Sequence, residues 1–267
     1  MYACVRVRVF VCAHINIAGF YKMVVFLSTL TNKWGWLQTH AILQNTFQSN
    51  LFFIMNKTTE TTIANAVNLF IIDESGSMAS VTESTRETFI GLLEKIKQEQ
   101  TEMPELQQFV NLWTFADNRF NERLIFQEVQ RWNGQAPDYR PTGGTPLNDA
   151  IGNALKKLEN YLFVKNLPAE STRVSVFVLT DGEENSSREW TTAGIRQYIG
   201  ECETKGWEFT YYGTDHDVWR AAEALNIKNH GYFSKNSAGM RDMVNEHNYA
   251  EYNKKMAYLQ KLKNPNP

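Results

Sequence analysis

Three short segments of the chain carry oxygen-bearing side chains at spacings that suit metal coordination. The first alternates an acid with two hydroxyl residues, and Gly76 between the hydroxyls permits a tight bend. The second is a Gly-Gly-Thr sequence that precedes an expected helix, and the third is a Thr-Asp-Gly sequence that follows an apolar run. The residues that we predict to form one metal site are Asp73, Ser75, Ser77, Thr145 and Asp181.

These side chains offer two carboxylates and three hydroxyls, with no nitrogen or sulfur ligand among them. Such hard oxygen ligands favour a small divalent cation, Mg²⁺ or Mn²⁺, with water or an incoming ligand completing its shell. Two carboxylates only balance the charge of the ion, and neutral hydroxyls leave it electrophilic. We therefore expect an acidic side chain of another protein to bind at an open position. Thr145 begins a helix whose positive end disfavours a cation, so we expect modest affinity for the metal alone.

The elements that must position these residues alternate between strands and helices. Buried strands are indicated by short apolar runs at 64–73, 109–115, 174–179, 207–212 and 231–233, and the alternating segment 123–130 fits an antiparallel edge strand. Helices are indicated after residue 83 and at 147–162, 190–202, 218–225 and 237–262. This order predicts an α/β fold, a doubly wound and mostly parallel sheet with helices on both faces. Ligands in such folds collect outside the carboxyl ends of the strands, where the strand order reverses.

Two helix starts have recognisable capping signals. Ser80-Val-Thr-Glu83 fits a capping box, and Thr145 followed by Pro146 fits an N-cap with proline at the first helical position. Asp215 or Asp217 is expected to cap the helix at Val218, with His216 a remote candidate for a ligand.

Other side chains have simpler interpretations. The charged run 241–263 is most simply a solvated helix face, beside which Met240, Met243 and Leu259 could dock a partner. Glu183 and Glu184 are expected to be solvated loop acids, with a second metal position as the alternative. Four tryptophans are expected to pack in or against the core: Trp113, Trp190, Trp207 and Trp219.

Charge and cysteine content exclude several classes of protein. The chain has 27 basic and 29 acidic residues, which argues against a general nucleic-acid or anionic-membrane binder. Three distant cysteines favour neither a disulfide framework nor a cysteine zinc site, so we expect a reduced, cytoplasmic location. Residues 1–54 contain four basic residues and no acid, and neither a membrane span nor a secretory signal fits them.

We interpret residues 1–54 as a leader, disordered or arising from a wrong gene start, with Met55 or Met23 as the alternative start. Residues 55–267 then form a single domain. Its core covers about 64–235, and its closing helix covers about 237–262.

The chain resembles a von Willebrand factor type A (vWA) domain with a complete metal-ion-dependent adhesion site. The resemblance rests on three motifs in this order: Asp73-x-Ser-x-Ser77, Gly-Gly-Thr145-Pro-Leu and Leu-Thr-Asp181-Gly-Glu-Glu. The resemblance, to the bacterial or phage intracellular type, covers about residues 64–235. It implies a Rossmann-like sheet with one antiparallel edge strand. It also implies that Ser75, Ser77 and Thr145 coordinate the metal, with Asp73 and Asp181 acting directly or through water. The resemblance further implies a protein partner, since proteins of this family often bind through a partner's Asp or Glu and bacterial intracellular members frequently work beside ATPases or modifying enzymes.

Other interpretations of the same residues remain open. Asp73 and the two serines alone would fit a turn that caps a helix, but capping does not need Thr145 and Asp181 as well. An EF-hand is excluded because its sixth position would be Met78 and its twelfth Ser84. A metal-dependent hydrolase or phosphotransferase would need a base near the serines, and the sequence places none there. A regulatory subunit of an ATP-driven complex differs from a binding module only in context. The prediction is therefore a non-enzymatic, metal-dependent protein-binding module.

Overall fold

The computed structural model describes residues 64–214 and 218–264, and the structural statements below concern these ranges. The expectations about the leader 1–54 and its alternative start codons lie outside the described residues. So do those about residues 215–217, including the expected cap of the helix at Val218.

The core of the fold is a six-stranded sheet with the order β3-β2-β1-β4-β5-β6. Neighbouring strands pair in parallel except β2 and β3, which form an antiparallel hairpin at one edge. This arrangement confirms the predicted mostly parallel sheet with one antiparallel edge strand. The strands are β1 (Ala64–Asp73), β2 (Leu106–Ala116), β3 (Arg119–Glu128), β4 (Thr172–Leu179), β5 (Glu208–Gly213) and β6 (Asn229–Tyr232).

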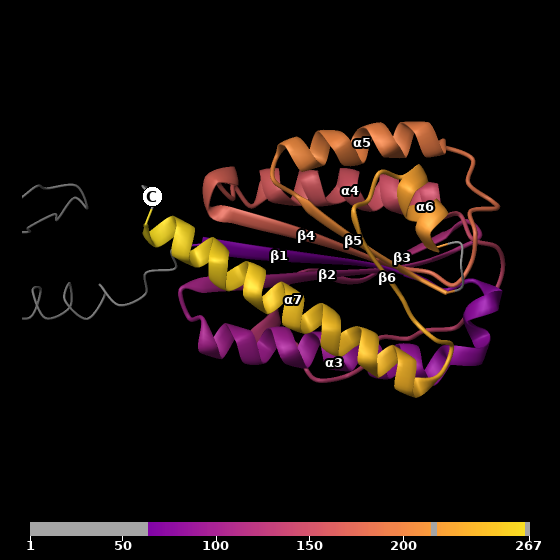
Figure 1. Cartoon of the computed structure of the whole chain (residues 1–267), viewed down its shortest axis with the longest axis horizontal. Helices are drawn as coiled ribbons and strands as arrows, with labels where there is room; N and C mark the ends of the chain where they lie inside the picture. The colour runs from indigo at the N-terminus through magenta and orange to yellow at the C-terminus, as the bar shows by residue number, and fades with distance from the viewer. Residues whose placement is uncertain (1–63, 215–217, 265–267) are drawn as a thin grey trace, which may run out of the picture. The chain divides into compact units, whose positions relative to one another are not determined.

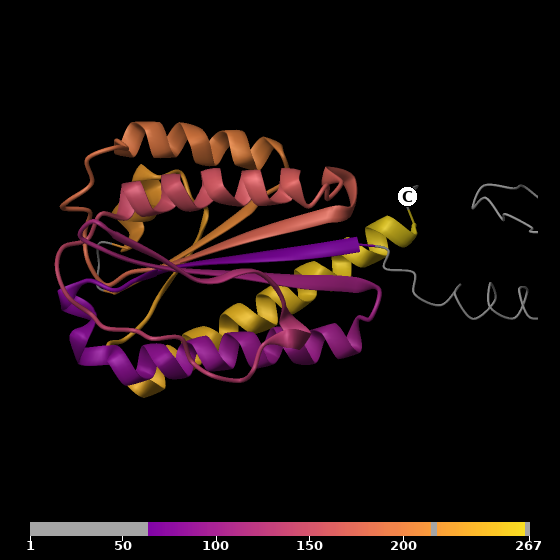
Figure 2. The same ribbon diagram turned by 180° about the vertical axis from the view of Figure 1, so that it is seen from behind.

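Helices cover both faces of the sheet, as predicted (Figures 1 and 2). One face carries α3 (Thr82–Glu102) and α7 (Ser237–Lys263), and the other carries α4 (Leu147–Val164), α5 (Thr192–Thr204) and α6 (Val218–Ala224). Short 3₁₀ turns lie at η1 (Gly76–Val81), η2 (Val129–Arg131) and η3 (Ala169–Ser171). Within the described ranges, no helix combines the length and the apolarity needed to cross a lipid bilayer.

The central strand β1 builds two hydrophobic cores because successive side chains of a strand point to opposite faces. Val67, Leu69 and Ile71 belong to the core that includes residues of α4 and α5. Phe70 and Ile72 belong to the core that includes residues of α3 and α7. A strand covered on both faces must be apolar at nearly every position, which is why β1 and β4 appear in the sequence as continuous apolar runs.

Both predicted helix caps are wrong. The helix α3 begins at Thr82, after the 3₁₀ turn η1, and its N-cap residue Val81 makes no side-chain cap. The predicted capping box from Ser80 to Glu83 is therefore not formed. The helix α4 begins at Leu147 with Pro146 in the N-cap position and no side-chain cap, so Thr145 lies outside the helix.

The closing helix α7 is less exposed than its sequence indicated. Met240, Met243 and Leu259, which we considered as docking residues, are buried in the cores. Two charged residues of the same helix are also buried and paired: Lys255 with Glu99 at 2.8 Å and Glu251 with Arg173 at 2.8 Å. The interpretation of the charged run as a solvated face holds only for the outer side of the helix.

Three of the four tryptophans pack as expected. Trp113 and Trp207 are buried and Trp190 is half-buried, stacked on Tyr198. The expectation is wrong for Trp219 in the first turn of α6, which is 64% exposed.

Candidate metal centre

Asp73 is the last residue of β1 and lies where the order of the strands reverses. The strand β1 has β2 on one side and β4 on the other, so the strand order runs outward in both directions from it. Open α/β sheets bind ligands at such a point. The carboxylate is fully buried and both oxygens accept hydrogen bonds, Oδ1 from the Ser75 N–H at 2.7 Å and Oδ2 from the Thr180 hydroxyl at 2.6 Å. Burial raises the pKa of Asp73 to about 6, against the opposing effect of these hydrogen bonds.

The two serines connect Asp73 to Asp181. Ser75 Oγ lies 3.0 Å from Ser77 Oγ, and the Ser77 hydroxyl donates to Asp181 Oδ1 at 2.6 Å. Gly76 between them lies close to the next loop, since its N–H donates to the Gly143 carbonyl at 2.9 Å. Four of the five predicted site residues thus form one continuous set of contacts.

Thr145 brings the fifth predicted side chain to the same place. A Cβ atom added to Gly182 would lie 3.3 Å from Thr145 Oγ1 and 3.6 Å from Ser77 Oγ, so both hydroxyls border one point beside Gly182. Asn185 fixes the Thr145 backbone, accepting from its N–H through Oδ1 at 2.8 Å and donating to its carbonyl at 3.2 Å. Because Thr145 does not cap α4, its hydroxyl makes no hydrogen bond to the first turn of that helix.

Asp181 has a buried carboxylate oxygen that accepts no hydrogen bond from the described residues. This oxygen is Oδ2, and the side chain that carries it is 0% exposed. The Lys235 ammonium lies 2.7 Å from this oxygen as an ion pair without good hydrogen-bond geometry. A buried carboxylate oxygen needs such a cation as its partner, and in this structure the ammonium of Lys235 takes that place.

The donor set fits the predicted ion. Two carboxylates and three hydroxyls surround one region, and all are hard oxygen donors suited to Mg²⁺ or Mn²⁺. In the part of the chain that the structure describes, no group of three or more His, Cys, Asp or Glu residues is placed to hold a metal. The site differs from such groups because most of its donors are hydroxyls. The structure brings the five residues together, and their role as metal ligands stays a prediction.

The Gly143-Gly144 turn that delivers Thr145 depends on Asp117. Gly143 has a φ of +81°, and a Cβ on it would lie 1.8 Å from Asp117 Oδ2. The Asp117 carboxylate accepts from the Gly144 N–H at 2.5 Å, and the Asp117 N–H donates to the Gly144 carbonyl at 3.0 Å. Only glycine combines this backbone conformation with this close approach.

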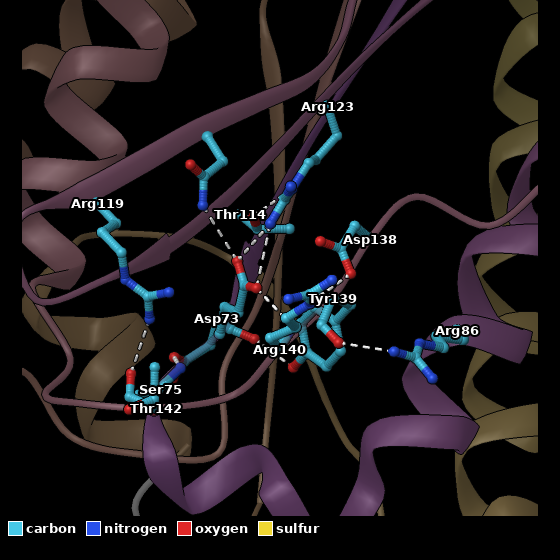
Figure 3. Close-up of polar contacts among 12 residues, drawn as sticks. Asp73, Ser75, Arg86, Thr114, Arg119, Arg123, Asp138, Tyr139, Arg140 and Thr142 are labelled. Carbon is cyan, nitrogen blue, oxygen red and sulfur yellow. Dashed lines mark hydrogen bonds and ion pairs between the residues drawn. The ribbon is translucent and has the colours of Figure 1, made fainter.

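Glu74 is a further site residue, which sequence reasoning missed. It lies between Asp73 and Ser75, its side chain is 1% exposed, and both carboxylate oxygens accept from Arg123 of β3 at 3.1 Å. It also accepts from the Arg140 N–H at 2.6 Å, and its own carbonyl accepts from the Thr142 N–H at 2.9 Å. Figure 3 shows Arg123 on one side and Arg140 and Thr142 on the other side of this region. Glu74 therefore joins the loop after β1 to the segment that leads into Thr145.

Two more acids fix the loop after β4. Glu184 is not the solvated acid that we expected: it accepts from the Asn148 N–H at 2.7 Å and from the Ser186 and Ser187 N–H groups at 2.9 and 2.8 Å. Asp149, which sequence reasoning also missed, accepts three backbone N–H groups from residues 188–190. Glu183 is exposed, as expected. Asp149 had no local signal because its partners lie about 40 residues away, whereas Glu184 accepts both from its own loop and from the Asn148 N–H 36 residues earlier.

Comparisons with known proteins support the fold. No protein-family model and no curated protein matches the sequence. The structure is similar to the pilus adhesin SpaC from Lactobacillus rhamnosus GG, with 12% identity, a TM-score of 0.53, and coverage of 71% of this chain and 31% of that chain. Proximal thread matrix protein 1 from the mussel byssus matches with 14% identity over 71% of this chain and 46% of that chain, at a TM-score of 0.47.

Two smaller proteins match at lower TM-scores. Manganese-loaded Plasmodium vivax TRAP has 16% identity over 67% of this chain and 71% of that chain, with a TM-score of 0.46. The SpRpn10 VWA domain has 15% identity over 68% of this chain and 94% of that chain, with a TM-score of 0.42. At these identities the likeness concerns the fold alone. This chain also spans less than half of the mussel protein and about a third of SpaC.

Proposed function

We propose that this chain is a vWA-type protein-binding module that holds Mg²⁺ or Mn²⁺ and captures an acidic side chain of a partner protein. Asp73, Ser75, Ser77, Thr145 and Asp181 would hold the ion. When bound, the ion supplies an electrophilic position that a carboxylate of the partner can fill.

The observation that carries the proposal is the meeting of three hydroxyls and two carboxylates at the reversal of strand order. The residues come from three loops, and the contacts run from Asp73 through both serines to Asp181, with Thr145 beside Ser77. A helix cap or a turn would need one of these side chains. Their convergence favours a cation site, since Asp181 Oδ2 is buried and is neutralised by a cation, the Lys235 ammonium, and not by a hydrogen bond.

The described histidines lie away from the site. Among the described residues, His247 is buried against Phe177 and Tyr212, and His230 lies beside Trp219, so neither is part of the site contacts. General-base catalysis by a histidine would need the imidazole within hydrogen-bond reach of a nucleophile, and the carboxylates of the site are assigned here to the ion. An ATPase or a modifying enzyme is a suitable kind of partner, and a cytoplasmic location is part of the same proposal.

Metal binding by the full chain tests the first half of the proposal. Calorimetric titration with Mn²⁺ should give saturable binding, which Asp73→Asn and Thr145→Val abolish or weaken at least tenfold. Asp242→Asn removes an exposed carboxylate of α7 and is the matched control. Circular dichroism shows whether each variant is folded. Equal Mn²⁺ binding by the original chain and by folded Asp73→Asn would refute the proposed site.

Partner capture tests the second half. The immobilised chain should retain a protein from its native cell extract in Mg²⁺, lose it in EDTA, and fail to retain it as Thr145→Val. Mutation of Asp and Glu residues in the captured protein should then locate one acid whose loss abolishes binding. Capture that is unchanged by EDTA and by Thr145→Val would refute metal-dependent recognition.

A further inference from the structure

Lys235 places a positive charge directly on the candidate metal centre. It lies between the end of β6 and the start of α7, and its Nζ is 2.7 Å from Asp181 Oδ2. The Asp181 side chain is 0% exposed, whereas the Lys235 side chain is 37% exposed. The ammonium therefore reaches the buried carboxylate from the solvent side.

This contact matters for a divalent cation because both charges compete for one carboxylate. Without Lys235, two carboxylates would face an ion of charge +2, and the site would be neutral with metal bound. The ammonium neutralises one of them and repels the ion as well. Like charges a few ångströms apart interact strongly even in a high-dielectric surface environment.

We propose that Lys235 is an internal counter-ion that competes with the metal for Asp181 and so keeps metal affinity low in the free module. This inference rests on the proposed function of the site. The same positive charge favours an incoming carboxylate, so a partner's acid and the metal bind better together than the metal does alone. The flexible lysine stem and the exposure of the side chain allow the ammonium to leave Asp181 when the ion arrives.

A purely structural role for Lys235 makes the opposite prediction. If the ion pair only tied the segment before α7 to the loop after β4, its loss would loosen the site and weaken metal binding. If Lys235 competes with the metal, its removal strengthens metal binding while the metal-free protein becomes less stable. The sign of the change in metal affinity therefore separates the two roles.

The experiment compares Lys235→Met, Lys235→Arg and the control Lys228→Met in the full chain. Lys228 is exposed and lies at the opposite end of β6, so its replacement removes the same charge at a greater distance from the site. In Mn²⁺ titrations we expect Lys235→Met to bind about tenfold more tightly than the original chain, which corresponds to ~1.4 kcal/mol. Lys235→Arg should stay near the original affinity, and Lys228→Met should change it less than about twofold, since exposed charges farther away are screened.

Thermal unfolding gives a second readout. In EDTA, Lys235→Met should unfold at a lower temperature, because Asp181 is left as a buried charge without its ion pair. Added Mn²⁺ should raise its unfolding temperature by more than it raises that of the original chain. Unchanged or weaker Mn²⁺ binding by Lys235→Met would overturn the inference.

The two proposals fail in distinguishable ways. If the original chain binds Mn²⁺ and Asp73→Asn does not, the metal site stands whatever Lys235→Met does. If the original chain and Asp73→Asn bind Mn²⁺ equally, the site itself is refuted, and the inference about Lys235 with it.

Discussion

The ion pair between Glu74 and Arg123 offers a sharp test of how the candidate site is held together. The Glu74 side chain is 1% exposed and the Arg123 side chain is 20% exposed. Removal of either partner leaves the other charge without its counter-ion. The remaining charge is more deeply buried when Arg123 is removed, because it is then the Glu74 carboxylate. The structure therefore predicts unequal costs for Glu74→Gln and Arg123→Met.

Arg123→Met should be the more damaging change. It leaves a carboxylate at 1% exposure with hydrogen bonds from Asn121 and the Arg140 N–H but no cation. Breaking a buried pair in this way costs about 3–5 kcal/mol. Glu74→Gln leaves a guanidinium that can turn toward solvent and still donate to Thr114, so we expect a loss of about 1–2 kcal/mol.

The double variant should be more stable than the sum of the single losses indicates. With both charges gone no buried ion remains unpaired, and residues in direct contact give coupling energies of about 1–3 kcal/mol. Urea unfolding followed by circular dichroism measures all four proteins, with equal slopes as evidence that the transition is comparable. Strictly additive losses, or a larger loss for Glu74→Gln than for Arg123→Met, would refute this account of the loop.

Three further predictions concern the site loop and two titrating residues of the closing helix. Gly143→Ala should lower the free energy of unfolding by at least about 2 kcal/mol and weaken Mn²⁺ binding. Alanine is strained at a φ of +81°, and its Cβ would collide with Asp117. An unchanged urea midpoint would contradict this. The contribution of His247 to stability should fall as the pH drops below 6.5, because burial lowers its pKa from 6.5 to about 4 and the unfolded chain takes up the proton first. The loss attributed to His247 amounts to roughly 3 kcal/mol between these values, and urea unfolding at several pH values should show it disappear in His247→Phe. Below pH 4.5 a further loss follows from Glu251: burial opposes its ionisation, but Arg173 outweighs this and lowers the pKa to about 2, so the stabilisation is lost between pH 4.5 and about 2.

The order of elements could be predicted from the sequence because it depends on local patterns. Continuous apolar runs marked the strands that are covered on both faces, and helical periodicity marked the segments between them. The predicted ends differ from the observed ones by a few residues: the strand expected at 123–130 is β3 at Arg119–Glu128. Capping was less predictable, since η1 occupies the place of the expected first helical turn and Pro146 takes the N-cap position of α4.

The buried charges of α7 were not predictable from local sequence. Lys255 pairs with a glutamate 156 residues earlier, and Glu251 pairs with an arginine 78 residues earlier. A charged run on a helix indicates a solvated face unless its partners are known, and those partners come from α3 and β4. Glu74 was missed for the same reason, because its guanidinium partner is 49 residues away on an edge strand.

The meeting of Asp73 with the Thr180-Asp181 pair follows from strand register. In the parallel pair of β1 and β4, Ile72 lies beside Leu179, so the next residues, Asp73 and Thr180, leave the sheet side by side. Their side chains meet at 2.6 Å, and the following residue, Asp181, is then within reach of Ser77. An acid directly after one central strand and a Thr-Asp pair directly after its neighbour must therefore meet once the two strands pair in this register. The local sequence is enough to bring Asp73 and Asp181 together once the strands pair, and their role as metal ligands stays a prediction. Glu74, Asp117 and Lys235 act through contacts that only the folded chain creates.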